Sequence, residues 1–203
     1  MWIFAGVVTM LVLAVVWRRR HPSPYPPGLG FLLAVRLPGL RPTPSLLAEH
    51  LVLEPGMRVL EIGPGIGVYT QAMMDRQPRA RLICVDVQPL MLHKLRRRLG
   101  ANAADLVCAD ASALPFRDRS FERLLLVSVL GEVPQRARAL GECGRLVSHD
   151  GAVFVAESVI DADYIAPGTL IRDARDADLL PVHRAGSWLS YTQRLRPRSR
   201  ARA

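Results

Sequence analysis

An apolar run that leads into closely spaced glycines is the feature that most constrains the fold of this chain. Residues 59–62, Val-Leu-Glu-Ile, are followed by Gly63, Gly65 and Gly67, and then by a segment with helical character. Glycine lets the backbone turn sharply and approach a ligand without a side chain in the way. The pattern therefore predicts a strand, a ligand-binding turn and a helix. A dinucleotide fingerprint would have its third glycine at position 68, where this chain has Val68, so the spacing disfavours NAD.

Short β-branched runs alternate with amphipathic segments after Leu46, which indicates parallel strands covered by helices. The predicted strands are residues 58–62, 81–86, 105–109, 123–128 and 152–156. The predicted helices are residues 45–51, 68–76, 89–99 and 135–147. Alternating residues on either side of Gly186 predict a final antiparallel hairpin over residues 180–194. The predicted fold class is α/β, Rossmann-like, with a mostly parallel sheet and an antiparallel C-terminal hairpin.

Two acidic residues follow predicted strands, where ligands of open parallel sheets bind. Asp86 ends the second strand and can accept both hydroxyl protons of a ribose. Its alternative role is an N-cap for the helix that begins near Pro89. Asp110 follows the third strand and can accept from an exocyclic amino group such as that of adenine, or it can simply form a turn.

A wider set of motifs carries a family resemblance over residues 54–197. The motifs are residues 61–67 (Glu-Ile-Gly-Pro-Gly-Ile-Gly), Asp86, residues 110–116 (Asp-Ala-Ser-Ala-Leu-Pro-Phe), Ser120 with Phe121, and residues 142–147 ahead of Asp150 and Gly151. With them the chain resembles the class I S-adenosylmethionine-dependent methyltransferases. The resemblance is greatest to the small-molecule branch typified by the ubiquinone and menaquinone biosynthesis methyltransferases, which have a methyltransferase type 11 domain.

The resemblance implies S-adenosyl-L-methionine as the cofactor and no metal. Glu61 and the glycine loop would hold its amino-acid part, Asp86 its ribose, and Asp110 with Ala111 its adenine. The full predicted cofactor-binding set is Glu61, Gly63, Pro64, Gly65, Gly67, Asp86, Val87, Asp110, Ala111 and Ser128. The chain departs from the family at Glu122, where an Asp is common, and at residues 149–151, His-Asp-Gly, which replace a Pro-Gly-Gly turn.

The acceptor is expected to face residues 129–132, just after the fourth strand. Glu132 is the candidate catalytic residue, as a general base or by orienting the acceptor. The alternative for Glu132 is an exposed loop position. Residues 164–180 have helical character, and the resemblance implies that they lie over the acceptor pocket.

The N-terminal segment predicts a membrane anchor. Residues 2–17 carry no charge, have a Trp at each end, and are followed by three arginines, residues 18–20. A cleavable signal peptide is the rival, but no Lys or Arg precedes the apolar run and no small-residue cleavage site follows it. The arginines predict a single-pass membrane protein whose catalytic domain lies on the cytoplasmic side.

The predicted organisation is a transmembrane anchor with a basic flank (residues 1–20), a Pro/Gly-rich linker (21–45), a methyltransferase domain (46–197) and a basic tail (198–203). Within the linker, the apolar patch of residues 31–35 is too short to span a membrane. It could rest on the bilayer, cap the active site or pack on the domain, and the sequence leaves these three alternatives open.

Charge and cysteine content exclude other classes. The formal charge of +9 comes almost wholly from arginine, but aromatic residues do not alternate with the basic ones as a single-strand-binding surface requires, so we expect no nucleic acid. Cys84, Cys108 and Cys143 are an odd number without metal-ligand spacing, which indicates neither a disulfide framework nor a zinc site.

The sequence thus predicts an enzyme that methylates a small acceptor, apolar or associated with the membrane. The alternative is a catalytically inactive membrane adaptor that binds the cofactor. Methylation of RNA or protein lacks support, since the chain has no Asn-Pro-Pro-aromatic motif and no added recognition domain.

Overall fold

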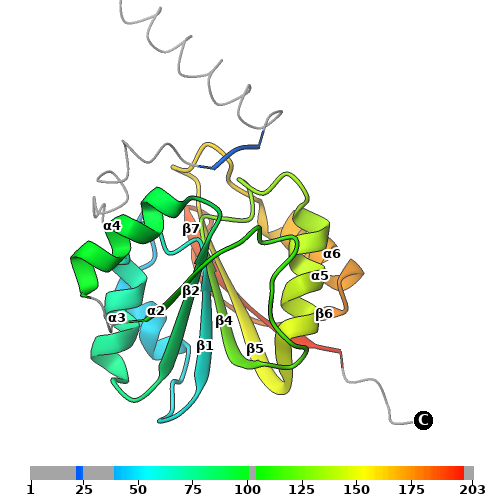
Figure 1. Ribbon diagram of the computed structural model, residues 1–203. Helices are drawn as coiled ribbons and strands as arrows, with labels where there is room; N and C mark the ends of the chain where they lie inside the picture. Colours follow the sequence, from blue (N-terminus) through cyan, green and yellow to red (C-terminus); the bar gives the residue numbers. More distant parts are fainter. Residues whose placement is uncertain (1–21, 25–38, 101–103, 199–203) are drawn as a thin grey trace, which may run out of the picture.

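The computed structural model describes residues 22–24, 39–100 and 104–198, which contain a single seven-stranded sheet (Figure 1). The strand order is β3-β2-β1-β4-β5-β7-β6. The strands are β1 (Arg58–Ile62), β2 (Arg81–Asp86), β3 (Asp105–Cys108), β4 (Phe121–Val127), β5 (Val147–Ser158), β6 (Leu179–Gly186) and β7 (Ser190–Pro197). The helices are α2 (Pro44–His50), α3 (Val68–Arg76), α4 (Pro89–Leu99), α5 (Arg136–Leu146) and α6 (Pro167–Asp176).

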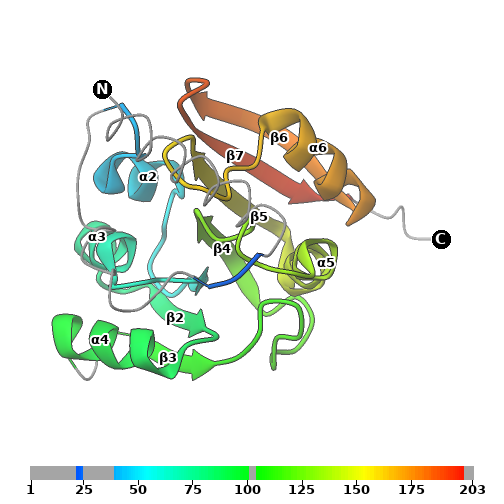
Figure 2. The same ribbon diagram turned by 90° about the horizontal axis from the view of Figure 1, so that it is seen from above.

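Helices cover both faces of the sheet. Helices α2, α3 and α4 lie on one face, and α5 and α6 lie on the other (Figure 2). The central strands are therefore buried on both sides, and β1 has four buried residues in a row after Arg58. Burial on both sides explains why these strands appear in the sequence as continuous apolar runs rather than as alternating ones.

The strand order creates a switch point between β1 and β4. Strands β1 to β5 are parallel, with β2 on one side of β1 and β4 on the other. Connections from the two strands therefore leave in opposite directions, which opens a crevice at their carboxyl ends. Strand β7 returns antiparallel to β5 and pairs with β6, and this confirms the predicted C-terminal hairpin.

Arg123 ties α2 to the start of β4. Its guanidinium is buried, with Nε donating to the carbonyl of Leu51 at 2.7 Å and Nη2 to the carbonyl of Val52 at 3.4 Å. A cation beside the last carbonyls of a helix is favourable, and it satisfies acceptors that the helix itself leaves open. Burial lowers the pKa of Arg123 from its ordinary value.

The five strands and four helices predicted within the parallel part are confirmed, with one substantial difference at β5. This strand begins at Val147 rather than near Ala152, so residues 149–151, which replace the Pro-Gly-Gly turn of the family, lie within a strand. An irregularity in the β4 pairing allows Val147 to pair with Phe121, and Gly151 has no side chain to collide with its neighbours. The predicted helical segment 164–180 contains the shorter helix α6.

Within the ranges that the structure describes, no helix combines the length and the apolar character needed to cross a membrane. The predicted anchor, residues 2–17, lies outside these ranges, as do the apolar patch of residues 31–35 and the tail beyond Arg198.

Candidate functional site

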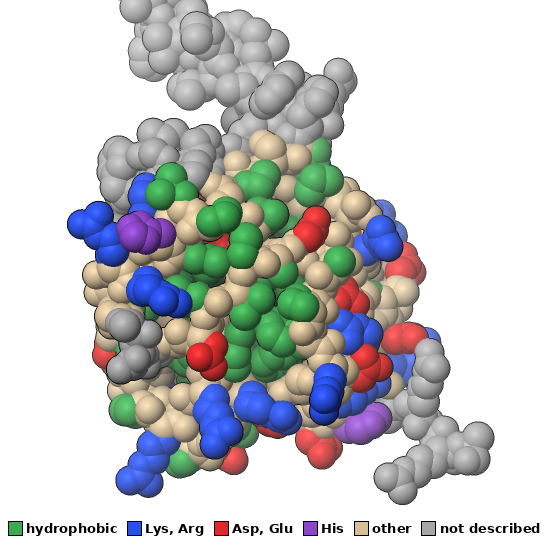
Figure 3. All heavy atoms as spheres, viewed as in Figure 1, with side chains coloured by type: hydrophobic (Ala, Val, Ile, Leu, Met, Phe, Trp, Pro, Cys, Tyr) green, Lys and Arg blue, Asp and Glu red, His purple; other side chains and the backbone are tan. Residues whose placement is uncertain are grey.

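A cavity of about 300 Å³ lies at the carboxyl ends of the parallel strands, at the switch point. Hydrophobic side chains occupy much of the upper and central part of the face drawn in Figure 3, whereas Lys and Arg side chains lie around its left, lower and right margins. The cavity is lined by Pro24, Arg41, residues 62–66, Val68, Tyr69, residues 85–88, Met91, residues 109–111, residues 127–129 and residues 132–134. Most of the predicted cofactor-binding residues thus meet around one cavity.

The glycine loop between β1 and α3 forms one wall. Gly63, Gly65 and Gly67 have φ values of +67°, +57° and +82°, a region that other residues rarely adopt. A Cβ atom on Gly67 would lie far inside contact distance of Leu95, and one on Gly63 would collide with Val129. The loop therefore needs glycine both for its backbone conformation and for its packing against α4 and the segment after β4.

Asp86 ends β2 and lies beside the cavity, 9 % exposed. Its Oδ1 accepts the backbone N–H of Gln88 at 2.9 Å, and burial raises the pKa of the carboxyl group. The N-cap of α4 is Gln88 rather than Asp86. A single local bond leaves the other carboxylate oxygen available to accept from a ligand hydroxyl.

Asp110 follows β3 and lines the same cavity. Its Oδ1 accepts from both the backbone N–H and the Oγ of Ser112, each at 2.7 Å. The bond from the backbone of Ser112 is the main reason that the pKa of Asp110 is lowered. The turn-forming role considered from the sequence is therefore present, and it fixes this carboxylate in the charged form at the cavity.

Gly67 and Glu61 are the two predicted cofactor-binding residues that do not line the cavity, and the side chain of Glu61 is 3 % exposed. Its Oε2 accepts from Thr70 Oγ1 at 2.5 Å, and Cys84 Sγ lies 3.7 Å away. Burial raises the pKa of Glu61 to about 7. In this arrangement the carboxyl group links β1 to α3 beneath the glycine loop.

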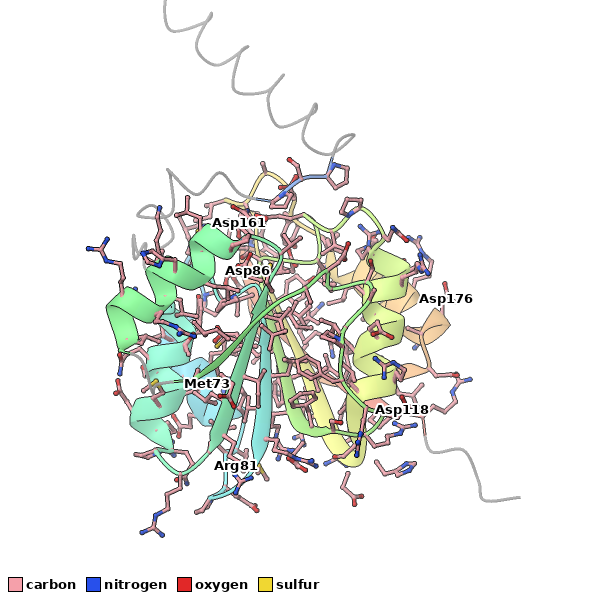
Figure 4. All side chains as sticks on the ribbon, viewed as in Figure 1. Met73, Arg81, Asp86, Asp118, Asp161 and Asp176 are labelled. Carbon is pink, nitrogen blue, oxygen red and sulfur yellow. The ribbon has the colours of Figure 1, made fainter. Side chains whose placement is uncertain are left out.

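Residues 39–43, here called the strap, cross the carboxyl ends of the strands between α3 and the loop after β5. Tyr69 of α3 donates its hydroxyl to the carbonyl of Pro42 at 3.0 Å, and Ser158 of β5 donates to the carbonyl of Leu40. Between these two points Arg41 pairs with Asp161 at 2.5 Å. Asp86 and Asp161 lie at the same end of the sheet in Figure 4, opposite Arg81.

Similarity to known proteins agrees with this geometry. Residues 60–155 match the family described as methyltransferase domain. The chain contains a methyltransferase domain. The resemblance stated from the motifs is thereby confirmed, and with it S-adenosylmethionine as the cofactor of this kind of domain.

The matches to individual relatives cover only part of each relative's length. The chain is 37 % identical over 100 residues to a malonyl-[acyl-carrier protein] O-methyltransferase of Halorhodospira halophila, covering 49 % of this chain and 34 % of the relative. It is 33 % identical over 118 residues to the ubiquinone/menaquinone biosynthesis C-methyltransferase UbiE of Bordetella avium, covering 57 % and 46 %. The chain thus spans less than half the length of these two relatives.

A solved structure confirms the fold of the methyltransferase domain. A SAM-dependent methyltransferase from Aquifex aeolicus superposes with a TM-score of 0.72 at 14 % identity, covering 85 % of this chain and 98 % of that one. This similarity extends well beyond residues 60–155, which agrees with a fold that includes the C-terminal strands.

Ser128, a predicted cofactor-binding residue, follows β4 with a φ of +55°. Its backbone N–H donates to the carbonyl of Ala156 at 2.8 Å, and its Oγ donates to Asp161 Oδ2 at 2.5 Å. Burial raises the pKa of Asp161, whereas Arg41 and the Ser128 hydroxyl favour its charged form. Ser128 is thereby held rigidly at the edge of the cavity.

Glu132 and Val129 line the cavity of the methyltransferase domain, but the two residues between them do not. Leu130 is fully buried in the core. Gly131 packs so closely on the backbone of Asp163 that a Cβ atom would collide with it. The expectation that all of residues 129–132 face the acceptor is therefore wrong, because the turn after β4 directs Leu130 into the core and packs Gly131 against Asp163.

A buried carboxyl group, Glu157, was missed from the sequence. It belongs to β5, is 1 % exposed, and its Oε2 accepts the backbone N–H of Ile165 at 3.3 Å. Among the described residues, Oε1 has no hydrogen-bond partner. Burial raises the pKa of Glu157 to about 8, with further contributions from Asp161 and Glu132. No local motif surrounds Glu157, so only the pairing of β5 with β7 could have drawn attention to it.

Proposed function

We propose that this chain is an S-adenosylmethionine-dependent methyltransferase whose acceptor is a small molecule, apolar or associated with a membrane. One observation carries the proposal. The glycine loop, Asp86 and Asp110 lie at the carboxyl ends of three adjacent strands and surround one cavity of about 300 Å³. A ligand made of an amino acid, a ribose and an adenine requires these groups, and the strands β1, β2 and β3 present them side by side.

The roles of the cofactor-binding residues follow from their positions. Asp86 accepts the ribose hydroxyls, and Asp110 with Ala111 contacts the adenine. Gly63, Pro64, Gly65 and Ser128 line the part of the cavity over β1 and β4, and hold the amino-acid part. Gly67 allows the close packing of the loop on α4, Val87 covers the ribose, and Glu61 supports the loop from beneath.

When bound, S-adenosylmethionine supplies a methyl group on a positively charged sulfur. The protein contributes chiefly by aligning the acceptor with that carbon and by excluding water, since an in-line displacement gains most from proximity and orientation. Where the acceptor atom carries a proton, Glu132 accepts it from within the cavity.

Exposed apolar side chains at the carboxyl end of the sheet support an apolar or membrane-associated acceptor. Val87, Leu90, Ile160 and Trp188 are large, exposed and located at the carboxyl end of the sheet, with Trp188 75 % exposed. Exposed apolar groups gathered on one side of a protein are typical of interaction sites. They fit a single-pass membrane protein in which residues 2–17 form the anchor and the domain lies on the cytoplasmic side.

Calorimetric titration of the full chain tests the cofactor. We expect saturable binding of S-adenosylmethionine, no binding of NADH, and a loss of about 10-fold or more in affinity for Asp86→Ala, since each removed hydrogen bond to a charged group costs about 1.5 kcal/mol or more. Asp176→Ala, at the end of α6 and away from the cavity, is the matched control. A folded chain that does not bind the methyl donor refutes the proposal.

Transfer of a labelled methyl group to membrane extracts tests the acceptor. We expect a lipid-soluble product, formed more slowly when residues 1–20 are deleted, because tethering raises the local concentration of a substrate in the bilayer. An unchanged rate would reject the membrane-associated acceptor. Cofactor binding without product on any acceptor, together with a stable protein partner, would favour the inactive adaptor instead.

A further inference from the structure

Arg41 differs from every other residue around the cavity in its charge. The described cavity lining contains three acidic side chains, Asp86, Asp110 and Glu132, and Arg41 is the one Lys or Arg within that lining. The strap holds it there through the bonds of Leu40 and Pro42 on either side. An arginine fixed between two backbone anchors is a positioned cation rather than a solvated one.

The order of the strands determines which part of the cofactor lies closest to Arg41. With adenine at Asp110 and ribose at Asp86, the ligand crosses β3 and β2 and must extend over β1 and β4, because neighbouring strands lie only about 4.8 Å apart. Its amino-acid end therefore lies beside Ser128, at the end of β4. Ser128 Oγ and Arg41 Nη2 each bond to a different oxygen of Asp161.

We propose that Arg41 binds the α-carboxylate of S-adenosylmethionine, an inference that rests on the proposed function. Without a cation this carboxylate would share a partly buried cavity with the acidic side chains of Asp86 and Glu132, and like charges repel there. Guanidinium groups bind carboxylates through two parallel N–H donors.

The existing contacts of Arg41 leave room for this bond. Its ion pair with Asp161 uses Nη2, and among the described residues no acceptor is found for Nε or Nη1. The side chain is 17 % exposed, so it is largely desolvated yet still reaches the cavity. Asp161 thus orients the guanidinium, and the strap becomes a wall of the cofactor site.

A comparison of two ligands isolates this contact. Calorimetry of the full chain measures the affinities for S-adenosylmethionine and for decarboxylated S-adenosylmethionine, which lacks only the α-carboxylate. In the unsubstituted protein we expect the carboxylate to increase affinity by roughly 10- to 100-fold, the range for hydrogen bonds between charged groups. In Arg41→Ala the ratio of the two affinities should fall to about 1 to 3, with little change for the decarboxylated ligand.

Two further variants sharpen the test. Arg172→Ala removes an exposed arginine from α6 and should leave the ratio unchanged. Arg41→Lys keeps the charge without the planar fork, so its ratio should lie between those of the unsubstituted protein and Arg41→Ala. If thermal melting followed by circular dichroism shows that Arg41→Ala is unfolded, Arg41→Lys serves as the test variant in its place.

The outcomes separate this inference from the proposed function. If the unsubstituted chain does not bind S-adenosylmethionine, the proposed function itself fails. If it binds, but substitution of Arg41 weakens both ligands equally or changes neither, the carboxylate of the cofactor is not the partner of Arg41. An unchanged ratio in Arg41→Lys, taken alone, would likewise overturn the inference.

Discussion

Glu157 couples the stability of the domain to pH, because its carboxyl group is buried in β5 and lies near two other acids. Burial is the main cause that raises its pKa from 4.5 to about 8, and Asp161 and Glu132 add to the effect. The folded protein therefore holds a proton that the unfolded chain releases at a much lower pH. The stabilisation is fully present below about pH 4.5 and is lost progressively as the pH rises through about 8.

Glu157→Gln removes this titration while nearly preserving the shape of the side chain. Each pH unit between the two pKa values costs the unsubstituted protein about 1.4 kcal/mol, or about 4 kcal/mol over three units. We expect the free energies of unfolding of the two proteins to agree within about 1 kcal/mol at pH 5. At pH 8 and above the variant should be more stable by a few kcal/mol.

Urea denaturation at pH 5, 7 and 8.5 measures this difference directly. Other groups titrate over the same range, Glu61 among them with a pKa of about 7, but they are common to both proteins and cancel in the comparison. Glu49→Gln, the same substitution at an exposed position of α2, is the matched control. A constant difference between Glu157→Gln and the unsubstituted protein at all three pH values would refute a raised pKa for Glu157.

Three further substitutions have defined outcomes. Gly67→Ala should lower the free energy of unfolding by about 1 to 3 kcal/mol in thermal melts, because Gly67 has a positive φ and a Cβ atom there would collide with Leu95. Gly141→Ala, with open space around it in α5, should be neutral or stabilising by up to about 1 kcal/mol. Arg123→Met should cost about 2 to 4 kcal/mol in urea denaturation, because the buried carbonyl of Leu51 loses its donor. The exposed Arg58→Met should cost less than about 1 kcal/mol. Glu132→Gln should lower kcat by about 100-fold or more for a protonated acceptor while the affinity for S-adenosylmethionine stays within about 2-fold.

Each of these expectations has a contrary result. Equal melting temperatures for Gly67→Ala and Gly141→Ala would mean that the glycine turn tolerates a side chain. Similar losses for the two arginine variants would show that burial of Arg123 adds nothing. A normal kcat in Glu132→Gln, with an acceptor that must lose a proton, would remove Glu132 from the reaction.

The parts predicted well from the sequence are those that depend on short-range patterns. The strand, glycine turn and helix over residues 58–76 were predicted with their observed bounds, because glycine spacing and periodicity are local properties. The antiparallel hairpin was predicted from alternation around Gly186, which has a φ of +98°. Asp86 and Asp110 were predicted at the cavity because parallel strands deliver their carboxyl ends to one edge.

Features that depend on distant parts of the chain were missed. The extension of β5 to Val147 depends on an irregular pairing with β4. The C-terminal end of β5 is buried because it pairs with β7. Glu61 shows a further limit, since the motif predicted contact with the cofactor and the side chain instead bonds to Thr70. The Pro- and Gly-rich composition of residues 21–45 indicated a linker and concealed the fact that Pro24 and Arg41 line the cavity.

The strap bears on how the protein can be dissected. A truncated protein that starts at residue 46, the boundary suggested by sequence patterns, would retain all seven strands and most of the hydrophobic core. It would nevertheless lose Arg41, along with the acceptors that Tyr69 and Ser158 use on the strap. Affinities measured on such a fragment would lack the contribution of the strap, so a protein used for ligand studies should begin before Gly39.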